Sequence, residues 1–111
     1  MPLINVGSDA EFAQNVLGEG VALAGFTASW CPHCKTLGPK LMELLNELPE
    51  LKMCRVDIDQ AAANTERFGI MSVPTLAFFK DGKMTAQISA GGQSVEQIKE
   101  FITQNLARLS A

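Results

Sequence analysis

The sequence predicts an α/β fold in which a mixed five-stranded sheet is flanked by four helices, and three observations support this prediction. Short apolar segments typical of strands alternate with helical patterns over the first two thirds of the chain, which favours parallel strands joined by right-handed crossovers. Asp81-Gly82 then separates two further strand patterns, which indicates a hairpin that adds an antiparallel edge strand. A chain of 111 residues with 47% apolar residues allows one compact domain, residues 1–111.

The strands are predicted from apolar content and length. Residues 3–6 indicate a short first strand. The apolar run 21–27 is too short for a typical helix and fits a central strand that is covered on both faces. Further strands are expected at 51–57, 75–79 and 84–89.

The first and last helices are predicted from their caps. Capping boxes begin them at Ser8 and Ser94, each followed three residues later by Glu or Gln. Gly18 and Gly20 end the first helix. The last helix places one apolar face toward the core, made of Val95, Ile98, Phe101, Ile102, Leu106 and Leu109.

The two middle helices are predicted from periodicity and breakers. Leucines at helical spacing indicate a long helix after the segment 28–34, with a kink at Pro39 and an end at Pro49. A shorter helix is expected at 59–68, closed by Gly69.

Charge and hydropathy exclude several function classes. The net charge is −3 and the nine basic residues are spread from Lys35 to Arg108, so no basic stripe predicts nucleic-acid binding. No apolar run approaches the roughly 18 residues that span a membrane. The first basic residue is Lys35, which excludes a secretory signal and a transit peptide, and Met1 favours an unprocessed chain. We therefore expect a cytoplasmic protein, monomeric by default at this size.

The pair Cys31 and Cys34 carries the chemistry. Both follow the predicted central strand at the start of a helix, where free amides and the helix dipole stabilise a thiolate on Cys31. Pro32 suits the first helical position, and a spacing of three lets the two sulfurs meet. The pattern predicts dithiol–disulfide exchange, in which Cys31 attacks a partner disulfide and Cys34 resolves the mixed disulfide.

A series of landmarks along the whole chain resembles the thioredoxin family. They are Trp30-Cys31-Pro32-His33-Cys34-Lys35, Pro39, Val56-Asp57-Ile58-Asp59, Val73-Pro74-Thr75, Gly82 and Gly91. The resemblance implies a thioredoxin fold, reduction of disulfides in partner proteins and electrons from a thioredoxin reductase. It also implies that the chain needs no bound cofactor, since the Cys31–Cys34 disulfide is itself the redox group.

The same resemblance assigns a docking surface. It implies that Pro74 follows a cis peptide bond and faces the cysteine pair. Trp30, Ser72, Val73 and Gly91 then bind an extended substrate segment, whose backbone pairs with Val73 in a small β-augmentation.

The sequence departs from ordinary thioredoxins in three places. His33 follows Pro32 where Gly-Pro is usual, and Pro-His resembles the bacterial periplasmic disulfide oxidase. A histidine there can add positive charge near Cys31, so we expect a reduction potential between about −270 mV and about −120 mV.

The other departures concern the surroundings of the pair. Gly25 stands where the family usually has a buried Asp thought to relay the proton of the second cysteine, and Arg55 replaces that Asp's usual Lys partner. Thr27 stands where an aromatic residue is common, and Met71 where a basic residue can occur. Without the Asp and its Lys partner, a water or a neighbouring side chain would have to substitute in the proton route. Thr27 and Met71 alter the rim of the site, and a more apolar docking surface there would suit a restricted set of partners.

Alternative interpretations stay open from sequence alone. A zinc site at the cysteines would need four ligands, and Cys54 and His33 are the remaining soft candidates, so we expect no metal. Cys54 lies in an apolar strand and is expected to be a buried thiol. Pro-His also fits a disulfide oxidase or isomerase, and a thioredoxin-fold binding module without chemistry is a third hypothesis.

Overall fold

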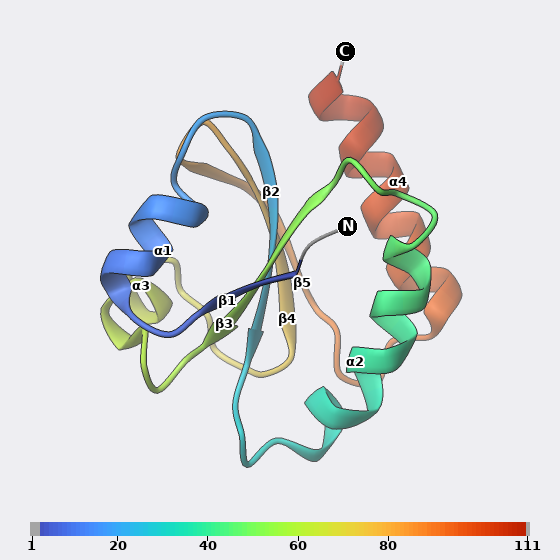
Figure 1. The fold of residues 1–111 in the computed structure, drawn as a ribbon. Coiled ribbons are helices and arrows are strands. Elements are labelled where there is room, and N and C mark those ends of the chain that lie inside the picture. The colour runs from blue at the N-terminus through green and yellow to red at the C-terminus, as the bar shows by residue number, and fades with distance from the viewer. Residues whose placement is uncertain (1–2, 111) are drawn as a thin grey trace.

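The computed structural model describes residues 3–110 and contains the predicted mixed sheet of five strands in the order β1-β3-β2-β4-β5. Figure 1 shows α2 and α4 on one face of the sheet and α1 and α3 on the other. In chain order the elements are β1 (Leu3–Val6), α1 (Asp9–Asn15), β2 (Val21–Thr27), α2 (Pro32–Leu45), β3 (Lys52–Asp57), α3 (Ala62–Arg67), β4 (Thr75–Lys80), β5 (Lys83–Ser89) and α4 (Val95–Ser110). No helix within residues 3–110 is long and apolar enough to cross a membrane.

β5 is an antiparallel edge strand, as the hairpin predicted, but β4 also runs antiparallel to the central strand β2, which was not predicted. β1 and β2 both pair in parallel with β3, whereas β4 pairs antiparallel with β2 and β5 antiparallel with β4. The six-residue helix α3 rises only about 9 Å. That is about half the length of a six-residue strand, so the chain re-enters the sheet at the end where β3 left it.

Two helices are shorter than predicted. α3 begins at Ala62 instead of residue 59, because the Asp57 carboxylate accepts N–H groups of Asp59 and Gln60 at 2.8 and 3.3 Å and holds them in a turn. α2 ends at Leu45 before a tight turn that precedes Pro49. Pro39 lies inside α2, and the helix axis in Figure 1 changes direction after its first turns, as a proline predicts.

The predicted local signals are largely confirmed. Ser94 and Gln97 form a reciprocal capping box, with N–H···O distances of 3.1 and 2.8 Å. At the first helix Ser8 Oγ accepts the Glu11 N–H, but the Glu11 carboxylate accepts the N–H of Gly7 instead of that of Ser8. The hairpin turn has φ values of 49° at Asp81 and 83° at Gly82, the left-handed pair that such a turn requires.

The sheet separates two apolar layers. The layer under α1 and α3 includes Phe12, Phe26, Phe79 and the fully buried Cys54. The layer under α2 and α4 includes Leu23, Met53 and Leu76, together with Leu41, Leu45, Ile98 and Ile102 from the helices. Cys54 is therefore a buried core thiol, as predicted, and burial raises its pKa.

A carboxylate from α1 caps the short helix α3. Ala61 at the N-cap offers no side-chain acceptor, and Asp9 supplies it from a distance in sequence. The Asp9 carboxylate accepts the Asn64 N–H at 3.0 Å, the Asn64 Nδ2 at 2.9 Å and the Ala63 N–H at 3.4 Å. These bonds, the Asn64 backbone N–H foremost, hold the pKa of Asp9 below its usual value of 3.8.

We expect Asp9→Asn to make the free energy of unfolding depend less on pH in the acidic range. A carboxyl whose folded pKa is depressed stabilises the fold above its unfolded pKa, and this contribution is lost as pH falls through the folded value. Urea unfolding of both proteins between pH 6 and pH 2.5 measures the difference. It should be largest at pH 6 and shrink toward the acid end, whereas a constant difference would contradict the assignment.

Candidate active site

The two site cysteines lie where the central strand gives way to α2. Cys31 is the N-cap residue of α2, and its Sγ accepts the backbone N–H of Cys34 at 3.2 Å. Pro32 follows at the first helical position, as predicted. The helix N-terminus therefore directs a free amide and its positive dipole end at Cys31 Sγ, which favours a thiolate there.

The segment before β4 forms the opposite wall. The Val73–Pro74 peptide bond is cis, as the family resemblance implied. Cys31 Sγ donates to the Val73 carbonyl at 3.7 Å, which places this backbone directly against the cysteine. Ser72 is held by its carbonyl, which accepts the Thr75 hydroxyl at 2.7 Å, and by its own hydroxyl, 3.1 Å from that of Ser89.

Gly91 lies against this wall, where an added Cβ would be in ordinary van der Waals contact. A Cβ built there would lie 3.4 Å from Pro74 Cδ, 3.9 Å from the Val73 carbonyl oxygen and 4.0 Å from His33 Cβ. The structure therefore brings Gly91, Pro74, Val73 and His33 together. Pro32 and His33 are exposed, and His33 lines a groove of about 220 Å³ between α2 and the start of α4.

Trp30 lies at the rim, 64% exposed, and its Nε1 donates to the Asp59 carboxylate at 3.1 Å. Sequence reasoning missed this role of Asp59. Asp59 belongs to the motif Val-Asp-Ile-Asp, which could have indicated a contact. The partner of Asp59, however, depends on how the turn after β3 packs against the loop after β2. Met71, which is 92% exposed, is the other large apolar side chain that residues 3–110 present to solvent.

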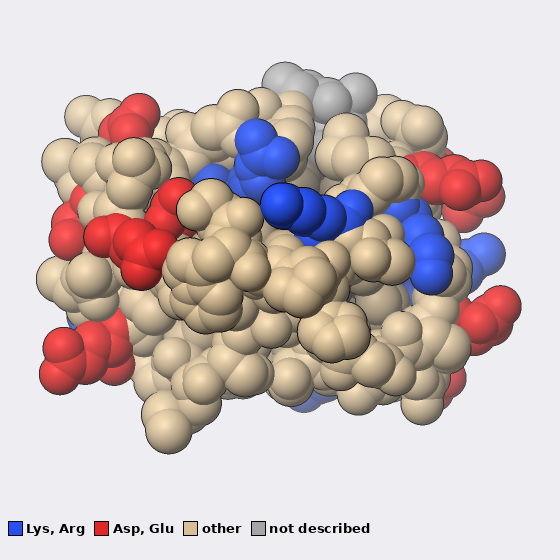
Figure 2. All heavy atoms as spheres, turned by 90° about the horizontal axis from the view of Figure 1, so that it is seen from below, with Lys and Arg blue, Asp and Glu red and all other residues tan. Residues whose placement is uncertain are grey.

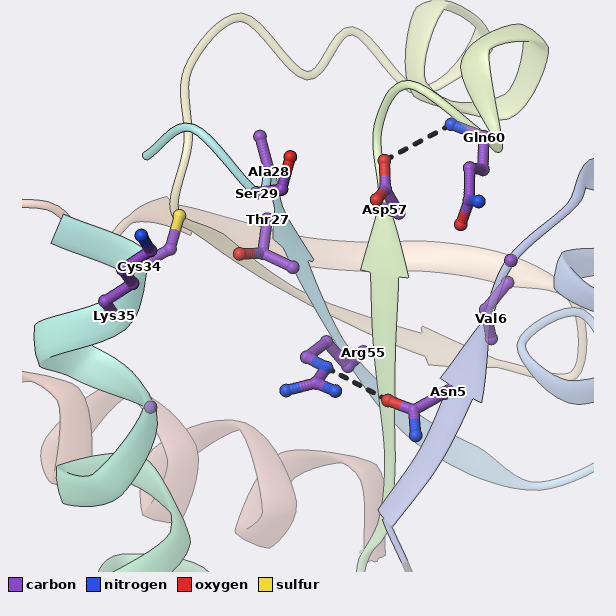
Figure 3. A pocket seen from close by; sticks show the side chains of 12 residues that line it. Asn5, Val6, Thr27, Ala28, Ser29, Cys34, Lys35, Arg55, Asp57 and Gln60 are labelled. Atoms are coloured by element: carbon purple, nitrogen blue, oxygen red, sulfur yellow. Dashed lines mark hydrogen bonds between the residues drawn. The ribbon is translucent and has the colours of Figure 1, made fainter. Parts of the chain in front are cut away.

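Cys34 lies between two cavities of different character. One has a volume of about 430 Å³ and a mixed lining, whose polar and charged side chains include Thr27, Lys35, Arg55 and Asp57. Figure 3 shows Cys34 Sγ on the wall nearest Thr27, and Arg55 turned instead to Asn5 Oδ1, 3.0 Å from its Nε. The other cavity, of about 60 Å³, lies on the inner side and is almost wholly apolar.

The two thiols differ in environment. Cys31 is only 3% exposed, whereas Cys34 is partly exposed, and all three cysteines of the chain are free. Burial raises the pKa of the Cys34 thiol, and its hydrogen bond with the Cys31 side chain adds to the increase. Hydrogen bonds to Cys34 from Thr27 and Ala28 act in the opposite direction. The balance of these effects favours a proton on Cys34.

A side chain at Gly25, beneath the pair, would require the end of the Met53 side chain to move. A Cβ at this position would lie 2.8 Å from Met53 Cε and 3.6 Å from Leu76 Cδ2. The Met53 side chain thus occupies the volume into which a side chain at position 25 would extend. Arg55 pairs with Gly25 across the sheet, but its side chain is exposed and bonded to Asn5.

Cys54 takes no part in the site. It lies in the layer under α1 and α3, where its Sγ donates to the Asn15 carbonyl at 3.8 Å. Within residues 3–110, no group of three His, Cys, Asp or Glu side chains could hold a metal ion.

Comparison with known proteins agrees with this geometry. The thioredoxin family model matches residues 4–104. Thioredoxin of Chlamydia trachomatis is 41% identical over 103 residues, covering 93% of this chain and 99% of the relative. Thioredoxin of Bacillus subtilis is 38% identical over 89 residues, covering 79% and 85%. The crystal structure of Malassezia sympodialis thioredoxin superimposes with a TM-score of 0.81 at 27% identity, covering 93% and 90%.

The fold and the cysteine pair at the helix start define the class of thiol–disulfide oxidoreductases. The chain belongs to the thioredoxin family.

We expect Gly25→Asp to destabilise the protein. The new carboxyl must displace Met53 Cε and be buried without a partner in an apolar layer, which costs on the order of 2 kcal/mol or more. Chemical denaturation of the reduced protein measures the loss. The same substitution should cost less unfolding free energy when Met53 is already Ala, because the shorter side chain leaves space for the carboxyl. This cost is the difference between Gly25→Asp/Met53→Ala and Met53→Ala alone. An equal or larger effect in the Met53→Ala background would contradict the packing argument.

Proposed function

We propose that this protein reduces disulfides in partner proteins, with Cys31 as the nucleophile and Cys34 as the resolving thiol. The observation that carries the proposal is the asymmetry of the pair. Cys31 Sγ accepts a helix N-terminal amide, whereas burial and Cys31 itself raise the pKa of Cys34. An anionic first thiol and a protonated second thiol are what stepwise exchange requires.

The reaction proceeds in two exchanges. Cys31 thiolate attacks one sulfur of the partner disulfide, that bond breaks, and the leaving sulfur takes up a proton. Cys34 then loses its proton and attacks Cys31 Sγ, which releases the partner's second thiol and forms the Cys31–Cys34 disulfide. Two electrons and two protons pass to the partner, and no bound cofactor is needed.

The docking surface proposed for the partner consists of Trp30, Ser72, Val73, Pro74 and Gly91. Figure 2 supports this, because the end of the molecule that it shows contains a broad area without charged residues, bordered by basic residues above it and by acidic residues at the left and right. An extended segment of uncharged residues fits this area, and pairing with the Val73 backbone would fix its direction.

The source of electrons and the setting follow from the family. We propose a thioredoxin reductase as electron donor, a cytoplasmic location and a monomeric state. Bacterial relatives named thioredoxin, from Bacillus subtilis and Chlamydia trachomatis, support the general activity.

We expect Cys34→Ser to accumulate mixed disulfides between Cys31 and partner proteins, since attack proceeds and resolution does not. Non-reducing gels of Cys34→Ser incubated with insulin, followed by mass spectrometry of the adduct, show which cysteine is linked. Cys31→Ser should form few adducts and lose insulin reduction.

The reverse variant is informative because Cys34 is the more exposed residue. Adducts that form on Cys34 in Cys31→Ser as fast as on Cys31 in Cys34→Ser would show that exposure, and not thiolate stabilisation, selects the nucleophile. Cys54→Ser is the matched control, because its thiol is buried in the other layer.

A second candidate is a disulfide oxidase or isomerase, which the Pro32-His33 dipeptide favours. A Neurospora crassa relative named protein disulfide-isomerase is 32% identical over 107 residues, although the match covers 29% of that protein. A binding module without redox chemistry would retain partner binding in Cys31→Ser and lack insulin reduction in the native chain.

We expect His33→Gln to lower the reduction potential by tens of millivolts, because a positive charge near Cys31 stabilises the reduced form. Fluorescence of Trp30, the chain's one tryptophan, reports the midpoint in thiol–disulfide buffers. A native midpoint near −200 mV or above favours the oxidising alternative, and one near −270 mV favours the reductase. An unchanged potential in the variant would show that His33 has no tuning role.

A further inference from the structure

Resolution requires Cys34 to lose its proton, and the layer beneath Cys34 offers no carboxylate to receive it. The inner cavity of about 60 Å³ is bounded there by Gly25, Met53 and Leu76. Met53 Cε fills the space beside Gly25. The one charged residue on this lining is Arg55, which is a cation and is bonded to Asn5. A proton cannot be handed inward, so it must leave on another side.

The other side of Cys34 is open, and several polar and charged side chains lie along it. Cys34 is partly exposed and lines the cavity of about 430 Å³, so water reaches its thiol from there. Thr27 lines both cavities, and Figure 3 shows its hydroxyl turned toward Cys34 Sγ. The Thr27 hydroxyl beside Cys34 acts to lower the pKa of that thiol, against the larger effect of burial.

The position of Thr27 follows from strand geometry. Side chains alternate between the faces of a strand, so residues 25 and 27 of β2 point to the same face, toward α2. Thr27 is the last residue of β2 and pairs with Asp57, the last residue of β3. It therefore lies one step nearer the open end than Gly25, at the border between the apolar layer and the polar cavity.

We propose that the Thr27 hydroxyl is a catalytic group for resolution, donating a hydrogen bond to Cys34 Sγ while the Cys34 proton passes to water in the outer cavity. The S–H bond of Cys34 breaks, its electron pair forms the bond to Cys31 Sγ, and the partner's sulfur leaves and is protonated by solvent. Thr27 keeps its own proton throughout. This inference rests on the proposed roles of Cys31 and Cys34.

Other titratable groups surround Cys34 and are included in the test. Cys31, His33 and Lys35 come from the start of α2, and Arg55 and Asp57 come from β3. Asp57 is the rival proton acceptor, because it lines the same cavity. Its carboxylate is engaged by the N–H groups of Asp59 and Gln60, which turn it toward α3.

The experiment follows the two exchanges separately. A slight excess of reduced protein reacts with 5,5′-dithiobis(2-nitrobenzoate) in a stopped-flow instrument between pH 5 and 9. Attack by Cys31 releases the first thionitrobenzoate, and resolution by Cys34 releases the second. Thr27→Val removes the hydroxyl at nearly constant volume and should slow the second release about threefold to tenfold, the order of one typical hydrogen bond. Its pH midpoint should rise, while the first release is unchanged.

Further variants separate the effect of the Thr27 hydroxyl from that of side-chain packing and from that of Asp57, the rival proton acceptor. Thr27→Ser should restore the native second release. Thr85→Val in β5 removes a hydroxyl that lines neither cavity and should change nothing. Native kinetics in Thr27→Val, or no recovery in Thr27→Ser, would overturn the proposal, as would slowing in Asp57→Asn alone. Failure of the proposed function looks different, because Cys31→Ser would then keep the first release at the native rate, with Cys34 as the attacking thiol, and would lack only the second.

Discussion

The site depends on one hydrogen bond, from the Cys34 amide to Cys31 Sγ at the N-terminus of α2. This bond exists because β2 is the central strand and α2 begins directly after it, so the free amides of the helix meet the first cysteine. The cis Val73–Pro74 segment then brings a carbonyl against the same sulfur. Sheet order, helix start and the segment before β4 together make the two thiols unequal.

Most of the fold was predictable because its signals are local. The apolar strands, the capping box at Ser94 and the Asp81-Gly82 turn depend on neighbours in sequence, and each lies where its residues indicated. The direction of β4 was not predictable in this way, because it depends on how far the connection through α3 reaches. The cap that Asp9 supplies to α3 joins residues more than fifty positions apart and has no local signature.

The cysteine pair and the cis proline could likewise be found from sequence, since motifs carry them. The surroundings of the cysteine pair could not be predicted from the sequence. The sequence shows that a carboxylate is missing at Gly25, but only the structure shows Met53 in its space and two unlike cavities on the sides of Cys34. The contact between Trp30 and Asp59 was also hidden, because it joins two loops that meet only in the folded chain.

The helix amide at Cys31 also ties redox state to folding. The unfolded chain keeps the two cysteines three residues apart but lacks the helix amide, the Val73 carbonyl and the apolar layer. Some stabilisation of the reduced pair therefore exists only in the folded state. Because folding and reduction form a closed thermodynamic cycle, the same free energy must add to the unfolding free energy of the reduced protein relative to the oxidised one. A higher reduction potential and a greater thermodynamic stability of the reduced protein are thus the same free energy measured in two ways.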